Sequence, residues 1–169
     1  VYLKAAVVDA VRSAGAEPLL LPPAGSQTDV AAYVDAILSR CDGVVITGGS
    51  FDIHPRHYGG TVGSRLDRVD EARTGLELLL AARCMETRVP VLGLCGGEQA
   101  LAVAAGGTLV GDLAQDWPGA GEHEQPTDPS EPWHAVHTEP GILQRVHGPL
   151  LQVNSTHHQA VNDPGRLRI

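Results

Sequence analysis

The sequence lacks several features that would assign it to a broad class of protein. Its 169 residues include three cysteines, Cys41, Cys84 and Cys95, at wide spacings that form neither a zinc-ligand pattern nor a disulfide framework. No apolar run is long enough to span a bilayer, and the first residues lack the basic, apolar and small-residue order of a signal peptide. We therefore expect a cytoplasmic protein with reduced thiols and no membrane partner.

Positive charge is also scarce. Twelve Lys and Arg stand against 20 Asp and Glu, for a net charge of -8, and the basic residues are scattered along the chain. This distribution argues against an extended phosphate-binding surface, so we expect no nucleic-acid partner. The length corresponds to about one domain, and a hydrophobic content of 43% is ordinary for a globular protein. We expect residues 1–169 to form a single domain.

Short apolar runs alternate with helical patterns along the chain. Helices are predicted at residues 1–14, 28–41, 69–88 and 97–107, and strands at 17–22, 42–49, 89–95 and 148–155. Residues 116–140 are rich in Gly, Pro and acidic residues and predict a long surface loop that leads into a short strand. Alternating strands and helices favour a flavodoxin-like α/β fold, a three-layer sandwich with a mostly parallel central sheet.

The two edges of this pattern look truncated. The first predicted helix, which Gly15 ends, has no strand before it, and residues 165–169 only begin a strand-like alternation. We therefore expect the sequence to be a fragment of its domain.

Three segments follow strands of the predicted sheet. They are "TGGSFD" at residues 47–52, Cys95, and "NSTHHQ" at residues 154–159. Ligands of open parallel sheets bind outside the carboxyl ends of the strands. We therefore expect the three segments to face one crevice.

Cys95 stands in the sequence Gly93-Leu94-Cys95-Gly96-Gly97, the small-x-nucleophile-x-small pattern of a nucleophile elbow. Its thiol would lie at the amino end of a helix, where the helix dipole and free N–H groups favour a thiolate. The turn by itself leaves a second interpretation open, in which Cys95 is a small buried residue in a glycine-rich corner. For Cys41 and Cys84 we expect core packing.

The glycines at the end of the predicted strand 42–49 could supply a second part of a site around Cys95. Thr47, Gly48 and Gly49 can form a backbone nest whose N–H groups face negative charge, although an ordinary turn is the alternative. His54 and His57 are three residues apart on an irregular, proline-containing loop, so we expect no metal there.

Taken together, these motifs resemble the class I glutamine amidotransferase-like family. The resemblance is strongest to its stand-alone branch in peptidase family C26, which hydrolyses γ-glutamyl-γ-aminobutyrate and related γ-glutamyl amides. It extends over nearly all of the chain and is carried, in the family's order, by "AGAEPLLLP", "DGVVITGGSFDIHPRHYGG", "VPVLGLCGGEQALAVAAGGTLVGDL" and "VNSTHHQAV".

The resemblance implies a mechanism and roles for single residues. Cys95 would attack the δ-carbonyl of a γ-glutamyl amide and form a thioester, which water then hydrolyses to glutamate. The backbone N–H groups of Gly49 and Gly96 would form the oxyanion hole. Gln99 and the loop residues Thr156, His157 and His158 would bind the substrate. The resemblance further implies a small-molecule substrate, no cofactor, a role in putrescine catabolism, and a homodimer as one option.

The sequence departs from the family in one respect that bears on catalysis. In the family, the base and its orienting acid belong to a His-Pro-Glu stretch downstream of the segment that matches "VNSTHHQAV", and these 169 residues contain none. The base would then come from outside them, or His157 or His158 would act instead.

Other polar residues near the motifs receive plain interpretations. We expect solvated side chains at His123, His134, His137 and His147, and a helix-dipole role for Glu98. His157 could shape the pocket wall while His158 faces solvent.

Three functions stay open at this point. The first is a hydrolase of γ-glutamyl amides that acts through Cys95. The second is a glutaminase subunit that supplies ammonia to a synthetase, although no synthetase domain is attached. The third is a catalytically silent binding module of the same fold.

Overall fold

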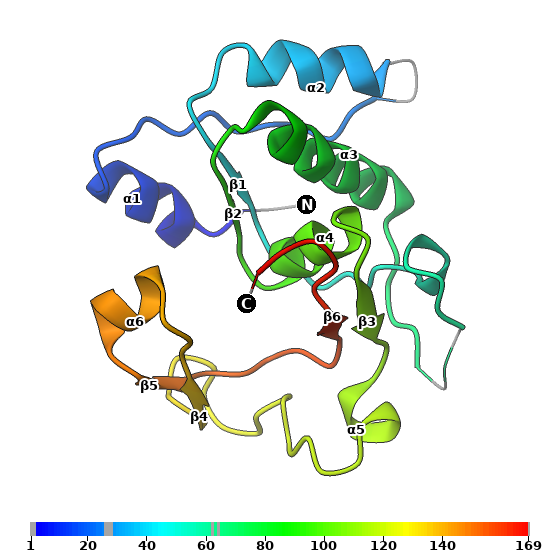
Figure 1. Cartoon of the computed structure of the whole chain (residues 1–169), viewed down its shortest axis with the longest axis vertical. Helices are drawn as coiled ribbons and strands as arrows, with labels where there is room; N and C mark the ends of the chain where they lie inside the picture. The colour runs from blue at the N-terminus through cyan, green and yellow to red at the C-terminus, as the bar shows by residue number, and fades with distance from the viewer. Residues whose placement is uncertain (1–2, 26–28, 62, 64, 169) are drawn as a thin grey trace.

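A computed structural model describes residues 3–25, 29–61, 63 and 65–168 of the chain. Its helices and strands are interspersed along the sequence, so the protein has a mixed α/β fold (Figure 1). The elements are α1 (Ala5–Ser13), α2 (Val30–Leu38), β1 (Val44–Ile46), the 3-10 helix η1 (Pro55–His57), α3 (Glu71–Thr87), β2 (Val91–Gly93), α4 (Gly96–Ala104), β3 (Thr108–Val110), α5 (Leu113–Asp116), β4 (His134–His137), α6 (Ile142–His147), β5 (Leu150–Val153) and β6 (Ala160–Asp163).

The helix starts follow from local capping chemistry. Asp29 accepts hydrogen bonds from the N–H groups of Ala31 and Ala32 and begins α2, and Asp70 accepts from Arg73 N–H and begins α3. Gly15, with φ of 86°, follows α1 as the sequence predicts.

The centre of the molecule is a parallel pair of strands. β1 pairs with β2 in the register Val44 to Val91, and α3 and α4 pack against both strands (Figure 1). One core cluster joins this pair to α2 and α3 through Val34, Ile46, Leu76, Leu80, Ala81 and Cys84. A second cluster, with Ile53, Ala100, Val103 and Leu109, joins α4 to β3. The expected core position of Cys84 is confirmed, and Cys41 is half-buried.

The hydrogen-bonded strands of the described residues form three separate two-stranded sheets. Besides the parallel β1–β2 pair, β3 pairs with β6 and β4 with β5, both antiparallel. On the β1–β2 pair, Ile46 is buried whereas Val45 and Leu92 are exposed. The described helices therefore cover one face of this pair, and the three-layer sandwich stays a prediction.

Two strand predictions are wrong. Residues 17–22 form no strand, and Leu19 and Leu20 are each 65% exposed. Among the described residues, no strand pairs with this segment to provide a ladder of backbone hydrogen bonds. Residues 165–168 form a turn after β6, with Gly165 at φ of 64°; Ile169 lies outside the described residues. The short helices α5 and α6 were not predicted, since four and six residues are too few for a helical pattern. No described helix is long and apolar enough to cross a membrane.

The contact between α4 and β1 gives a stability prediction. A side chain at Gly97 would collide with the backbone carbonyl of Ile46, so Gly97→Ala should destabilise the fold by about 1–3 kcal/mol despite alanine's better helix propensity. The matched control is Gly75→Ala in α3, where a Cβ meets nothing within 4 Å. This control should stabilise the protein by roughly 0.5–1 kcal/mol. Urea unfolding curves measure the free energy of unfolding of the two variants. Equal changes in that free energy would contradict the contact between α4 and β1.

Candidate active site

Cys95 occupies a strained turn between β2 and α4. Its backbone has φ of 53° and ψ of -113°, a conformation that residues with a Cβ rarely adopt. Its side chain makes no capping hydrogen bond to α4 and is exposed. The thiol therefore stands free at the amino end of a helix.

The glycines around Cys95 make this turn possible. A Cβ on Gly93 would lie 2.5 Å from the backbone nitrogen of Glu98, and one on Gly97 would collide with Ile46. With glycine at both positions, β2 can turn directly into α4 while α4 lies against the end of β1. The sequence pattern around Cys95 thus produces an elbow.

The glycine loop, defined here as Thr47, Gly48 and Gly49, lies directly beside the elbow. A Cβ on Gly48 would lie 2.9 Å from Cys95 Cβ and 3.4 Å from the backbone nitrogen of Gly96. A Cβ on Gly96 would lie 4.0 Å from the backbone nitrogen of Gly49. The ends of β1 and β2 therefore meet as the parallel pairing predicts.

Two backbone N–H groups at this junction have no hydrogen-bond acceptor among the described residues. Within the described part of the chain, neither Gly49 N–H nor Gly96 N–H donates a hydrogen bond. Unpaired N–H groups beside a helix start favour negative charge. Free backbone donors of this kind are one component of an oxyanion hole.

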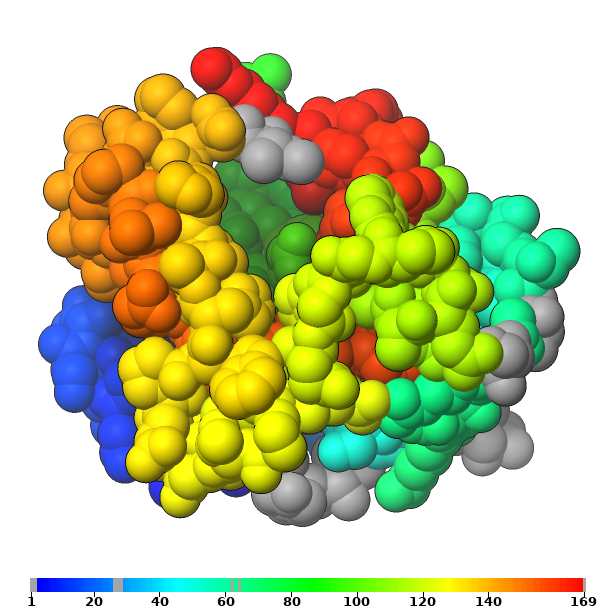
Figure 2. Space-filling model, turned by 90° about the horizontal axis from the view of Figure 1, so that it is seen from below, coloured from blue at the N-terminus to red at the C-terminus, as the bar shows by residue number. Residues whose placement is uncertain are grey.

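An open cleft of about 530 Å³ adjoins the elbow. Figure 2 shows a hollow between the C-terminal segment, in red, and the segment around α6, in orange, with green atoms at its floor. The lining residues are Cys95, Glu98, Gln99, Ala102, His157, Gln159, Ala160, Val161, Pro164, Leu167 and Arg168. The cleft is large enough for a small-molecule ligand.

Gln99 lines this cleft one helical turn beyond Cys95. It is buried, and its side-chain amide donates to the backbone carbonyl of Gln159 at 2.8 Å. The Gln159 side chain in turn accepts from Ile53 N–H at 3.1 Å. Gln99 therefore holds the 154–159 loop against α4 as well as facing the cleft.

His157 is the histidine of this loop that lines the cleft. Its Nδ1 lies 2.9 Å from the Gln159 carbonyl, so Nδ1 carries the proton and Nε2 of the neutral ring does not. Burial lowers the pKa of His157, the bond to Gln159 opposes this, and neighbouring histidines lower it further. The imidazole is thus kept in a form that can accept a proton.

Two of the histidines expected in solvent form a cluster with His157 instead, in which His123 lies between His157 and His134. The His123 ring centroid lies 5.0 Å from that of His157 and 4.9 Å from that of His134. Both histidines are half-buried, so the expectation of full solvation is wrong for them, whereas His137 and His147 are exposed. Residues far apart in sequence build this cluster, and no local pattern indicates it.

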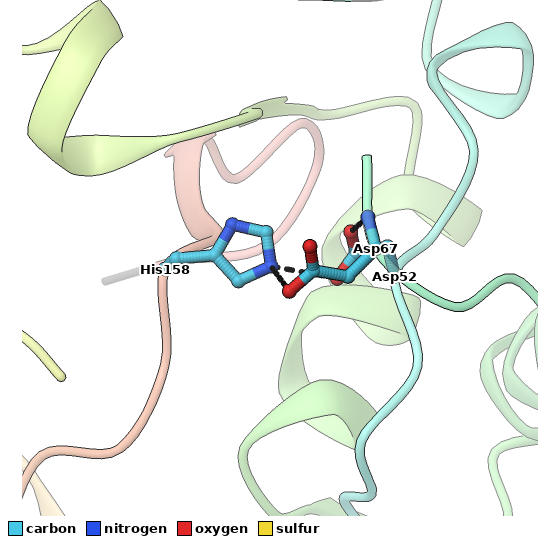
Figure 3. A group of neighbouring side chains, drawn as sticks. All are labelled: Asp52, Asp67 and His158. Carbon is cyan, nitrogen blue, oxygen red and sulfur yellow. Dashed lines mark hydrogen bonds and ion pairs between the residues drawn. The ribbon is translucent and has the colours of Figure 1, made fainter. Parts of the chain in front are cut away.

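His158 points away from the cleft toward two acids. Figure 3 shows its Nε2 facing Asp52, at 2.9 Å from Oδ1, and Asp67, at 3.7 Å from Oδ2. His158 is 11% exposed, so the expectation that it faces solvent is wrong. Hydrogen bonds from Arg65 lower the pKa of Asp67.

The three side chains have the spacing of a metal-ligand group, with ligand atoms within 4.8 Å of one another. Two of these contacts are already made between protein groups, because His158 Nε2 bonds to Asp52, and Asp52 accepts from Asp67 N–H at 2.6 Å. The other ring nitrogen of His158, Nδ1, is buried without a hydrogen-bond partner among the described residues. The evident effect of the three side chains is to tie the 154–159 loop to the loop after β1.

The other expected site residues take different positions. Thr156 is exposed, forms a backbone bridge with Glu124, and does not line the cleft. Glu98 does line the cleft, and desolvation there raises the pKa of its carboxyl. His54 accepts from Arg56 N–H, and His57 pairs with Glu71. Gln99 and His157 thus line the same cleft as Cys95, whereas Thr156 and His158 do not line it.

Comparison with known proteins gives a family-level match. The family model of Peptidase C26 matches residues 1–168. YvdE of Lactococcus lactis, named as a glutamine amidotransferase-like protein, is 30% identical over 165 residues, which cover 98% of this chain and 67% of that protein.

Two further relatives have similar identity. Protein NtpR of Enterococcus hirae is 32% identical over 164 residues, which cover 96% of this chain and 66% of that protein. The γ-glutamyl-γ-aminobutyrate hydrolase PuuD of Escherichia coli K12 is 33% identical over 172 residues, which cover 96% of this chain and 65% of that protein.

The positions of the three thiols predict an order of alkylation. Cys95 is exposed, Cys41 is half-buried, and burial of Cys84 both blocks access and raises its pKa. Iodoacetamide near neutral pH should therefore label Cys95 first and Cys84 last, as followed by peptide mass spectrometry. In denaturant the three rates should converge. Equal rates in the folded protein would contradict this geometry.

The lowered pKa of His157 predicts a loss of stability in mild acid. An unfolded imidazole titrates near 6.5, whereas the folded one resists protonation. The unfolded state therefore binds more protons as the pH falls below 6.5, and the free energy of unfolding decreases until the folded pKa is passed.

His157→Gln should flatten this pH dependence, measured by urea unfolding between about pH 7 and about pH 5.5. The matched control is His147→Gln on α6, where the side chain is exposed. If the His157 variant kept the wild-type slope, the cluster would not be the cause.

Proposed function

Because the chain belongs to the peptidase C26 family, a glutamine amidotransferase-like family of hydrolases, we propose that it hydrolyses γ-glutamyl amides with Cys95 as the nucleophile. The observation that carries this proposal is the elbow itself. An exposed thiol at a strained strand-to-helix turn lies beside the backbone N–H groups of Gly49 and Gly96, which donate to no group in the described part of the chain. A role limited to packing would account for neither the exposure nor the unpaired donors.

The proposed chemistry proceeds through a thioester. The Cys95 thiolate attacks the δ-carbonyl carbon, and the carbonyl oxygen takes up negative charge that the N–H groups of Gly49 and Gly96 stabilise. The C–N bond then breaks, and the amine leaves with a proton. Water attacks the thioester, releasing glutamate and restoring the thiol.

The proton transfers need a base near Cys95. We propose that it is the histidine of a His-Pro-Glu stretch outside these 169 residues, as in the family pattern. His157 is the alternative, supported by its position on the cleft wall and its unprotonated Nε2. A His157→Gln variant that keeps most of its turnover would favour the first assignment.

The glutamyl head group would bind in the cleft. We propose direct contacts from Gln99 and His157, which line the cleft. Thr156 and His158 would act through the position of the loop, since His158 is bonded to Asp52.

The relatives support one further proposal, about the domain. YvdE and PuuD are longer than the region that aligns with this chain. The aligned region covers 67% of the length of YvdE and 65% of the length of PuuD. We propose that residues 1–169 belong to one domain of the three-layer type. The exposed face of β1 and β2, at Val45 and Leu92, would pack against further elements of that domain.

The proposed function predicts the effect of removing the thiol. In the full-length protein, Cys95→Ala should lower kcat for γ-glutamyl-γ-aminobutyrate by about 10³-fold or more, because neither of the other two thiols lines the cleft. Cys41→Ala should leave kcat unchanged and serves as the control. Release of glutamate in a coupled assay measures both.

The choice of substrate separates the proposed hydrolase from its rivals. Hydrolysis of γ-glutamyl-γ-aminobutyrate in preference to glutamine supports the stand-alone hydrolase. A strong preference for glutamine would identify a glutaminase subunit, and binding without turnover would identify a silent module. Undiminished turnover in the Cys95 variant would contradict the mechanism.

A further inference from the structure

A half-buried arginine holds the glycine loop from the side of α3. The Nη2 group of Arg73 donates to the carbonyl of Thr47 at 2.7 Å and to the carbonyl of Gly48 at 3.1 Å. One nitrogen of a guanidinium thus fixes two successive carbonyls of the loop beside Cys95. Hydrogen bonds from a charged donor are stronger than those between neutral groups.

The guanidinium is itself held in place. Its Nε donates to Oε1 of Glu77, one helical turn further along α3, at 2.7 Å. Its centre lies 5.1 Å from the ring centroid of Phe51. The side chains of Arg73 and Glu77 are 17% and 19% exposed, so water competes little for these bonds.

The planar peptide passes this constraint on to an N–H group. The carbonyl of Gly48 and the N–H of Gly49 belong to one trans peptide unit, in which they point in opposite directions. A guanidinium that binds the Gly48 carbonyl therefore turns Gly49 N–H away from Arg73. It also polarises that unit, which makes Gly49 N–H a better donor.

The packing leaves the loop little freedom to turn over. Gly49, Gly96, Arg73 and Glu77 share the lining of a hollow of only about 10 Å³, at most the room of one water molecule. A side chain on Gly49 would collide with Nη1 of Arg73. The absence of a Cβ at Gly49 is thus what lets the guanidinium lie against the loop.

We propose that Arg73, held by Glu77, is a positioning residue that sets the direction of Gly49 N–H and thereby forms one half of the oxyanion hole. This inference rests on the proposed function for its effect on catalysis. Its structural part, the control of the Gly49 peptide, does not depend on that function. Lysine cannot replace the arginine, because an ammonium group lacks the planar fork that serves Glu77 and two carbonyls together.

The test compares Arg73→Lys and Glu77→Gln in the full-length protein with a matched control. The control is Arg83→Lys, on the same helix and with an acidic partner, Glu86, three residues away. The readouts are kcat and KM for γ-glutamyl-γ-aminobutyrate, the rate of Cys95 alkylation by iodoacetamide, and the ¹⁵N–¹H resonances of the glycine amides.

Arg73→Lys should lower kcat by about 10-fold to 100-fold with KM within about 2-fold, because the N–H matters most once the oxyanion forms. Glu77→Gln should act in the same direction with a smaller loss. Alkylation of Cys95 should keep its wild-type rate, since that reaction forms no oxyanion. The Gly49 amide resonance should move in both variants and stay in place in Arg83→Lys.

Other results would overturn the inference. The first is an unchanged kcat of Arg73→Lys together with an unmoved Gly49 resonance. The second is a fall in kcat that is matched by an equal fall in the rate of Cys95 alkylation, because this would indicate a general loss of structure. If Arg73→Lys does not fold, the kcat, alkylation rate and Gly49 resonance of Glu77→Gln test the inference by the same criteria. If the wild-type protein hydrolyses no amide, the proposed function fails, and the Gly49 resonance alone decides whether Arg73 sets the peptide.

Discussion

The geometry of the candidate site depends on one close contact, that between the first turn of α4 and the end of β1. Only a glycine at position 97 lets the helix backbone lie against the Ile46 carbonyl. That contact leaves β2 no room for a gradual turn, so Cys95 takes the strained conformation between strand and helix. The exposure of its thiol and its distance from the glycine loop follow from the same contact.

The remaining site residues are held by hydrogen bonds and ion pairs between the segments that follow β1, β2 and β5. Arg73 binds the glycine loop from α3, Asp52 and Ile53 bind the 154–159 loop through His158 and Gln159, and Gln99 binds the same loop from α4. Each polar tie is buried or half-buried and bridges segments distant in sequence. Such a network keeps donors in place before substrate binds, which is the physical basis of electrostatic catalysis.

The sequence alone predicts the parts of this arrangement that local chemistry determines. Asp29 and Asp70 mark helix starts because their carboxylates cap N–H groups, and glycines around Cys95 indicate the tight turn. Residues 17–22 have the composition of a strand, but pairing depends on a neighbour that composition cannot reveal. His158 is largely shielded from solvent for the same kind of reason, because it packs against Asp52 and Asp67, which lie far earlier in the sequence. For Arg73 there was one signal, its four-residue spacing to Glu77 on a helix that follows the glycine loop.

The central claim is that Cys95 carries the acyl group during turnover. The direct measurement is to mix the full-length protein with γ-glutamyl-γ-aminobutyrate, quench with acid within the first turnovers, and map the peptides by mass spectrometry. The account predicts one γ-glutamyl group on the peptide that contains Cys95, removed by hydroxylamine as a thioester is. Turnover with the acyl group on another residue would contradict it.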